Sequence, residues 1–267
     1  LYSTNVLNGD SNYQFKRKFR PHEKTMFLCR PKESRVSVAG FLSALSGQQN
    51  VLADNVWIGE RLAIASDDAI VFENRLSVDR QKVLKEHVVD GKVMAPGALY
   101  LVMAEGAARK GLGVRALELC DVAIQAPMVL GEGERSVQTI LTRQSSSDWN
   151  VRIASKSDSE NGWTIHALAR MQTTVSERQI RAVPVGDELD DAIAVDALYS
   201  GLRERGVELG AAFRLVRDIR TKGQHRIASI SNPFGQALHP AVLDACFQSL
   251  ADCGGKPAKK TTYLLRG

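Results

Sequence analysis

Residues 87–97 read HVVDGKVMAPG, and this stretch decides how the chain is expected to fold. It sets His87, a turn glycine at position 91 and the pair Pro96-Gly97 at fixed spacing directly before an apolar run. Proline is favoured in the first turn of a helix, and glycine lets the backbone reverse tightly. The stretch predicts that Gly91 turns the chain so that His87 faces the start of a long helix. Taken alone, this histidine also has an ordinary explanation as a surface or core residue.

A second segment, far along the chain, gives that histidine a partner. Residues 239–248 read HPAVLDACFQ, which predicts a helix that starts at Pro240 and carries Asp244 and Gln248 one turn apart on one face. Apolar side chains surround Asp244 in the sequence, and a carboxyl group in such surroundings needs a compensating interaction. We therefore expect the Gln248 amide to hold the Asp244 carboxyl group by a hydrogen bond.

Together the two segments resemble the dehydratase domains of modular polyketide synthases and of the related animal fatty acid synthase. The hallmarks of that family are HxxxGxxxxP and a helix of the type HPxxxDxxxQ, and both occur here without a substitution at their named positions. Residues 57–73 resemble the opening strand of the family, residues 96–101 its first long helix and residues 163–167 a later strand. The resemblance covers roughly residues 51–267.

The resemblance implies an α+β fold, the double hot-dog, in which two antiparallel sheets each wrap around a central helix. The apolar pattern agrees, because it predicts a helix at 95–110 and then strands near 116–129, 135–143, 149–155 and 163–173. The second hot-dog is expected to be incomplete, since family domains continue with further strands where this sequence stops. The predicted division has four parts: a basic leader at 1–50 that resembles a post-acyltransferase linker, a first hot-dog with His87 at 51–175, a linker at 176–194, and a second hot-dog with Asp244 at 195–267.

Composition and charge fit an enzyme domain and argue against a membrane or nucleic-acid partner. No run approaches the ~20 apolar residues of a membrane span, and no secretory signal is apparent. The net charge of +5 arises within residues 1–35, because the rest of the chain carries 27 basic and 27 acidic residues. The four cysteines lack CxxC spacing, which favours reduced thiols over a metal site or a disulfide framework. We expect a cytoplasmic protein without a bound metal.

The resemblance implies loss of water from a 3-hydroxyacyl thioester, which requires removal of an α proton and protonation of the β hydroxyl group. His87 as neutral imidazole is the expected base, and Asp244, kept protonated by apolar surroundings, is the expected acid. The negative charge that develops on the thioester oxygen is expected to be stabilised by the start of the helix at Pro96 and Gly97, where the helix dipole is positive. The substrate pocket is expected to include Leu209, Phe213 and Tyr100.

One segment departs from the family pattern. Where the family commonly carries Tyr-Gly-Pro-x-Phe, residues 209–213 read LGAAF, so the tyrosine hydroxyl and the proline are lost. Ordinary dehydration remains the favoured activity, and migration of a double bond from the α,β to the β,γ position is the alternative. Two further classes stay open, a product-template cyclase of the same fold and a catalytically silent double hot-dog module.

Expected partners follow from the resemblance. The domain itself is expected to bind no cofactor, and its substrate is expected to arrive on the phosphopantetheine arm of an acyl carrier protein. Flanking synthase domains, an acyltransferase and a ketoreductase, are implied, and so is a homodimer. The remaining histidines are expected to be structural, with a role for the last of them in fixing the start of its helix: His22, His166, His225 and His239.

Overall fold

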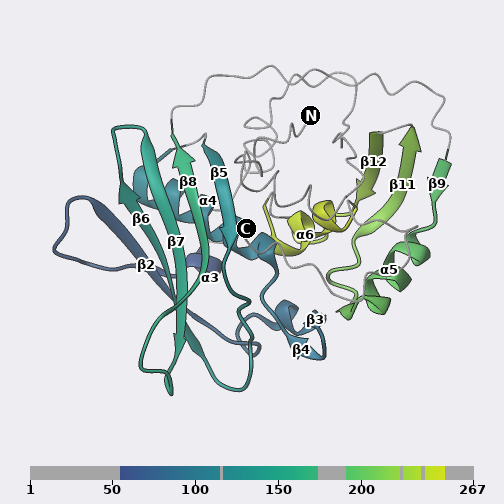
Figure 1. Cartoon of the computed structure of the whole chain (residues 1–267), viewed down its shortest axis with the longest axis horizontal. Helices are drawn as coiled ribbons and strands as arrows, with labels where there is room; N and C mark the ends of the chain where they lie inside the picture. Colours follow the sequence, from purple (N-terminus) through teal and green to yellow (C-terminus); the bar gives the residue numbers. More distant parts are fainter. Residues whose placement is uncertain (1–54, 115–116, 174–190, 223–224, 236–237, 250–267) are drawn as a thin grey trace.

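The computed structural model describes residues 55–114, 117–173, 191–222, 225–235 and 238–249 (Figure 1). The predicted leader, most of the predicted linker, and the expected incompleteness of the second hot-dog lie outside these residues. The first half contains α3 (Asn55–Ile58), β1 (Glu60–Arg61), β2 (Ala69–Leu76), a 3-10 helix η1 (Lys82–Glu86), β3 (His87–Val89), β4 (Lys92–Val93), α4 (Gly97–Leu112), β5 (Glu118–Ile124), β6 (Arg135–Arg143), β7 (Asp148–Ser157) and β8 (Thr164–Gln172). The second half contains β9 (Asp191–Ile193), α5 (Val195–Glu204), β10 (Val207–Leu209), β11 (Val216–Lys222), β12 (His225–Ile230) and α6 (Pro240–Gln248).

The first half is an antiparallel sheet curved around one buried helix. Its strands follow the order β1-β2-β6-β7-β8-β5, and α4 packs against β6 and β7 (Figure 1). Small residues let neighbouring elements approach α4 closely: a Cβ atom at Gly106 would lie 3.2 Å from a methyl carbon of Ile58. Nine of the sixteen α4 residues are buried, which is expected of a helix enclosed by its sheet.

The second half repeats this plan with a smaller described sheet. Strands β12, β11 and β9 pair antiparallel in that order, and α6 packs on β11 and β12. Helix α6 also packs on α4, so the two central helices lie side by side between the sheets (Figure 1). The expected α+β arrangement of two antiparallel sheets, each with its own central helix, is confirmed.

A third, short sheet joins the halves. It has the order β10-β3-β4, so that β10 of the second half pairs with β3 of the first. The two residues between β3 and β4 are Asp90, with φ 49°, and Gly91, with φ 72°. Positive φ at both central residues defines the turn type that suits a two-residue hairpin, and glycine adopts it without strain. Gly91 reverses the chain as the sequence predicts.

Two local predictions differ from the structure. Trp57 and Ile58 lie on the short helix α3 instead of on an opening strand. Helix α4 begins and ends two residues later than predicted, because Pro96 keeps an extended backbone as the N-cap and Gly113 ends the helix in a left-handed conformation. The Gly113 N–H donates to the carbonyl oxygen of Arg109 over 3.0 Å, which satisfies an end carbonyl of the helix.

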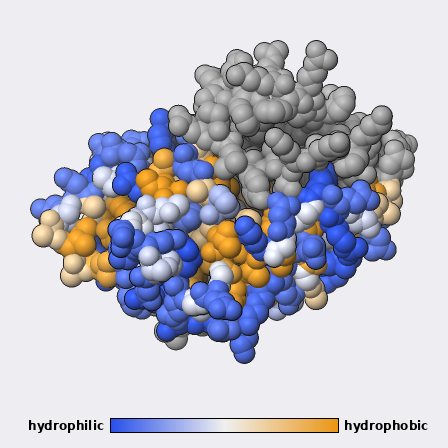
Figure 2. Space-filling model, turned by 60° about the horizontal axis from the view of Figure 1, so that its bottom comes forward, coloured by the Kyte–Doolittle hydropathy of each residue, from blue (hydrophilic) through white to orange (hydrophobic). Residues whose placement is uncertain are grey.

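Some apolar side chains remain on the surface of the described residues. Figure 2 shows apolar areas surrounded by hydrophilic side chains on the face that lies at the bottom of Figure 1. Across the whole described surface, the exposed large apolar residues are Val56, Ile64, Val129, Trp163, Ile165 and Leu168. Within the described part of the chain, no helix has the length and apolar character needed to cross a membrane.

Candidate active site

His87 lies at the start of β3 and is oriented by the hairpin that follows it. The Met94 N–H donates to the His87 carbonyl oxygen over 3.0 Å, and His87 Nδ1 lies 2.8 Å from the Met94 carbonyl oxygen. A carbonyl oxygen only accepts hydrogen bonds, so Nδ1 carries the proton and Nε2 of the neutral ring has a free lone pair. The side chain is 8% exposed. The β3–β4 hairpin therefore fixes both the direction and the tautomer of a buried imidazole.

Asp244 lies in the middle of α6, with Gln248 one turn further along. Gln248 Nε2 donates to Asp244 Oδ2 over 2.7 Å and to the Phe213 carbonyl oxygen over 3.0 Å. Burial raises the pKa of Asp244, although the charge of His87 and the hydrogen bond from Gln248 act in the lowering direction. The expected contact between Gln248 and Asp244 is present. A carboxyl group with a raised pKa is suited to carrying a proton that it can donate.

Phe213 connects these two groups. Its ring centroid lies 5.2 Å from that of His87 at an interplanar angle of 54°, and its carbonyl oxygen holds Gln248. The Phe213 ring is fully buried and packs against the imidazole of His87. Phe213 therefore contacts His87 directly and Asp244 through Gln248.

Leu209 lies directly opposite His87 in the β10–β3 pair. Opposed residues of an antiparallel pair point to the same face of the sheet, so the half-buried leucine side chain lies beside the imidazole. Position 209, where the resembling dehydratase domains commonly carry a tyrosine, therefore lies next to His87. Leucine at this position offers no hydroxyl group.

The start of α4 contains the other predicted residues. Pro96 is the N-cap and Gly97 the first helical residue, and the first amides of a helix lack partners within it. A Cβ atom at Gly97 would lie 2.9 Å from Ile124 Cδ1, so a larger residue there would require the end of the Ile124 side chain to move. Tyr100 is buried, and its ring stacks on His166 with centroids 6.2 Å apart.

His166 and His239 have structural partners, as the sequence predicts for both. His166 Nε2 lies 2.7 Å from Ser155 Oγ, and Nδ1 lies 3.1 Å from the carbonyl oxygen of Ala126. His239 is the N-cap of α6, where its Nδ1 accepts the Ala241 N–H over 3.2 Å, and its ring stacks on Phe234. A protonated imidazole cannot accept this bond, so the cap requires neutral His239.

This hydrogen bond at the start of α6 predicts that the folded protein loses stability in acid. Burial lowers the pKa of His239 from 6.5 to about 4, so the unfolded chain takes up this proton before the folded protein does. The free energy of unfolding should therefore fall between pH 6.5 and 4, with a contribution of up to about 3 kcal/mol from this residue. The raised pKa of Asp244 acts in the opposite direction.

Denaturant unfolding of wild type and His239→Asn from pH 7.5 to 4.5 measures this effect. Asparagine also caps helices but does not titrate, so the variant should lose less stability in acid. Equal pH dependence in both proteins would contradict the assignment.

Sequence reasoning missed Glu86, the residue before His87. Its carboxylate oxygen Oε2 accepts the Ala212 N–H over 2.7 Å, and its carbonyl oxygen accepts the Gly210 N–H over 2.8 Å. No sequence signal indicates a contact between residues 126 positions apart, although an acidic residue next to the expected base is visible in the sequence.

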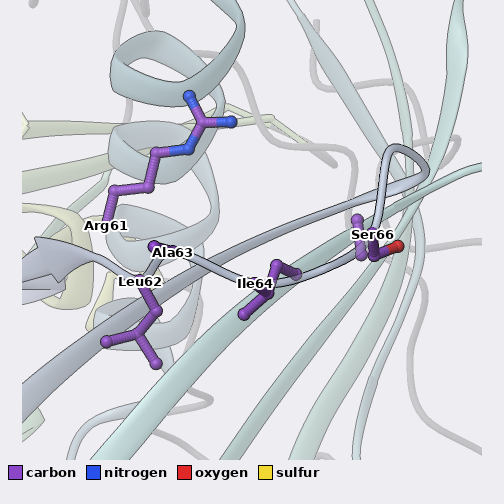
Figure 3. A pocket seen from close by; sticks show the side chains of 6 residues that line it. Arg61, Leu62, Ala63, Ile64 and Ser66 are labelled. Carbon is purple, nitrogen blue, oxygen red and sulfur yellow. The ribbon is translucent and has the colours of Figure 1, made fainter.

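A surface hollow of about 360 Å³ lies elsewhere, along the loop between β1 and β2 (Figure 3). Its walls contain none of the predicted site residues: they are Arg61, Leu62, Ala63, Ile64, Ser66 and Ala69. The candidate active site is therefore the region around His87 and Asp244, and not this hollow.

Fold and site together define a class of protein: a double hot-dog in which a buried histidine of one half is linked through packed side chains to a carboxyl group of the other. The sequence model described as the polyketide synthase dehydratase domain matches residues 56–156. A second model, described as the polyketide synthase dehydratase N-terminal domain, matches residues 181–265. The chain belongs to this family of dehydratase domains.

Individual relatives agree with the family models. Erythronolide synthase EryA2 of Saccharopolyspora erythraea is 31% identical over 191 residues, which cover 68% of this chain and 5% of the relative. Fusarin C synthetase of Gibberella fujikuroi is 26% identical over 227 residues, which cover 78% of this chain and 6% of the relative. The chain thus spans only a small part of both relatives.

A solved structure agrees as well. The dehydratase domain from the CurK module of curacin polyketide synthase is 25% identical, with a TM-score of 0.67, and the match covers 76% of this chain and 75% of that one. Structures of the CurK dehydratase include two variants described as inactive, one with a histidine replaced by phenylalanine and one with an aspartate replaced by asparagine.

Proposed function

We propose that this domain removes water from a 3-hydroxyacyl thioester on an acyl carrier protein and yields the 2-enoyl thioester during polyketide chain processing. One observation carries the proposal: His87, whose Nδ1 is held by the Met94 carbonyl oxygen, and Asp244, a carboxyl group of raised pKa, are linked through Phe213 and Gln248. Such a pair can act as base and acid on one small substrate.

Each proton has a place in this reaction. His87 Nε2 takes the α proton, and the electrons of the broken C–H bond form the Cα–Cβ double bond. The Cβ–O bond breaks as Asp244 gives its proton to the hydroxyl group, which leaves as water. Both hydrogens of Gln248 Nε2 are donated, one of them to Asp244 Oδ2, so the transferable proton belongs on Oδ1.

The helix start completes the proposed site. The Gly97 N–H, supported by the positive end of the α4 dipole, would stabilise negative charge on the thioester oxygen, with Pro96 fixing the start of the helix. Gly91 would act indirectly, through the turn that orients His87. Leu209, Phe213 and Tyr100 remain the proposed pocket residues.

Assays with carrier-protein thioesters test the proposal. The domain, produced with the further chain that such synthases carry, is incubated with 3-hydroxyacyl and with 2-enoyl thioesters, and mass spectrometry follows the change of 18 Da that accompanies loss or gain of water. Conversion in both directions is the expected result. A folded domain that converts neither substrate would refute the proposal. The inactive histidine and aspartate variants of the CurK dehydratase support the choice of residue types.

Leu209 favours a second candidate, migration of the double bond from the α,β to the β,γ position. Without a hydroxyl group beside His87, less help is available for orienting the β oxygen of the substrate. Deuterium uptake at the γ carbon of an enoyl thioester, measured by NMR in D₂O, would support the isomerase.

A substitution at this position predicts a measurable change. Leu209→Tyr should raise the dehydration rate about fivefold, the equivalent of one neutral hydrogen bond, and lower any γ exchange. Leu209→Phe, which adds the ring without the hydroxyl group, is the control. If both variants behave alike, the hydroxyl group has no role in the reaction.

The wider organisation belongs to the same proposal. It includes a four-part division at residues 1–50, 51–175, 176–194 and 195–267, a phosphopantetheine-bound substrate, neighbouring acyltransferase and ketoreductase domains, a homodimer and a cytoplasmic location. Light scattering on the purified protein measures the oligomeric state.

A further inference from the structure

The turn at residues 210–213 contacts Glu86 on one side and, through Phe213, both His87 and Gln248 on the other. The main chain of Glu86 accepts the Gly210 N–H over 2.8 Å, and its carboxylate accepts the Ala212 N–H over 2.7 Å. Glu86 directly precedes His87, so one residue connects the strand of the base to this turn. Hydrogen bonds from backbone amides to a carboxylate are stronger than neutral ones.

Two contacts lead from the turn to the site. The Phe213 ring contacts His87, and the Phe213 carbonyl oxygen accepts the hydrogen bond of Gln248. Gln248 in turn holds Asp244. A shift of the turn would therefore reach the acid through an unbroken series of contacts.

The contact between Glu86 and the turn leaves no spare room. A Cβ atom at Gly210 would collide with the Glu86 carboxylate and would lie 2.8 Å from both Cβ and Cγ of Glu86. The turn itself closes through the Phe213 and Arg214 N–H groups, which both donate to the Gly210 carbonyl oxygen. Packing and hydrogen bonds thus set a single position for the turn relative to Glu86.

We infer that Glu86 is a positioning residue, which acts through the 210–213 turn to hold Asp244 in its working place relative to His87. The inference rests on the proposed dehydration. His87 keeps an anchor of its own, the hydrogen bond from Nδ1 to Met94. Loss of the Glu86 carboxylate therefore displaces the acid more than the base.

Two reactions distinguish an effect on the acid from an effect on the base. Exchange of the α proton of a 3-hydroxyacyl thioester with D₂O needs the base alone, whereas loss of water needs both groups. Glu86→Ala should lower kcat for dehydration about 10- to 100-fold, as expected for a misplaced catalytic group. It should lower α exchange no more than about threefold and leave KM nearly unchanged, because exchange requires only a neutral imidazole in place.

Three further variants sharpen the experiment. Glu86→Gln keeps an oxygen that can accept the Ala212 N–H and should restore most of the dehydration rate. Glu86→Asp is shorter by one methylene group and should also lower dehydration more than α exchange, but by a smaller factor than Glu86→Ala. It replaces the alanine variant if that variant does not fold. Asp148→Ala is the matched control, because that carboxylate also holds a turn, through Ser145 and Ser147, but in the first sheet.

An NMR measurement makes the test independent of turnover. The side-chain amide signals of Gln248 should shift in Glu86→Ala and stay in place in Asp148→Ala. Unchanged Gln248 signals, or equal losses of dehydration and exchange, would overturn the positioning role. If wild type converts no substrate while these signals still respond to Glu86→Ala, the proposed dehydration fails and the coupling stands.

Discussion

His87→Ala is expected to abolish both dehydration and α-proton exchange, because both reactions need the proposed base. The imidazole is the only group in the proposed mechanism that receives the α proton, and a positioned base contributes about 10²- to 10⁴-fold to rate. Rates of both reactions should therefore fall about 10²- to 10⁴-fold. Mass spectrometry follows dehydration, and NMR in D₂O follows loss of the α-proton signal.

Folding must be separated from chemistry in this variant. The His87 main chain, which accepts the Met94 N–H, is unaffected by the substitution, so the hairpin should remain closed. Thermal unfolding and the NMR spectrum of the backbone check this directly. A folded His87→Ala variant that retained turnover near the wild-type rate would show that another group is the base.

Asp244→Asn should give the second largest effect and a different pattern. Asparagine can still interact with Gln248 but cannot donate an acidic proton, so dehydration should fall about 10²- to 10⁴-fold. The α exchange should remain detectable, since the free Nε2 of His87 is unaffected. The ratio of the two rates, measured on the same sample, is the readout.

A double variant tests whether the pair acts as a unit. Residues that cooperate in one step show strongly non-additive losses, so His87→Ala combined with Asp244→Asn should be scarcely slower than His87→Ala alone. Losses of both reactions in equal measure in Asp244→Asn would contradict the division of roles. In that case the aspartate would act on the base and not on the leaving hydroxyl group.

The sequence by itself determined the local elements that carry the site. The hairpin with Gly91, the helix start at Pro96 and the Asp244–Gln248 contact each follow from residues within one stretch of at most eleven positions. Turn chemistry, proline at a helix start and the repeat of an α-helix act over such short spans, so they are visible in the chain itself. The order of the two hallmark motifs then indicated the fold.

Only the tertiary structure decided how these local pieces combine. The pairing of Leu209 with His87, the Phe213 ring behind the imidazole and the Glu86 carboxylate on the 210–213 turn all join residues far apart in the sequence. The closeness of Gly97 to Ile124 Cδ1 is likewise a contact that no local pattern contains. These contacts depend on strand pairing and close packing between halves, which no short stretch of sequence specifies.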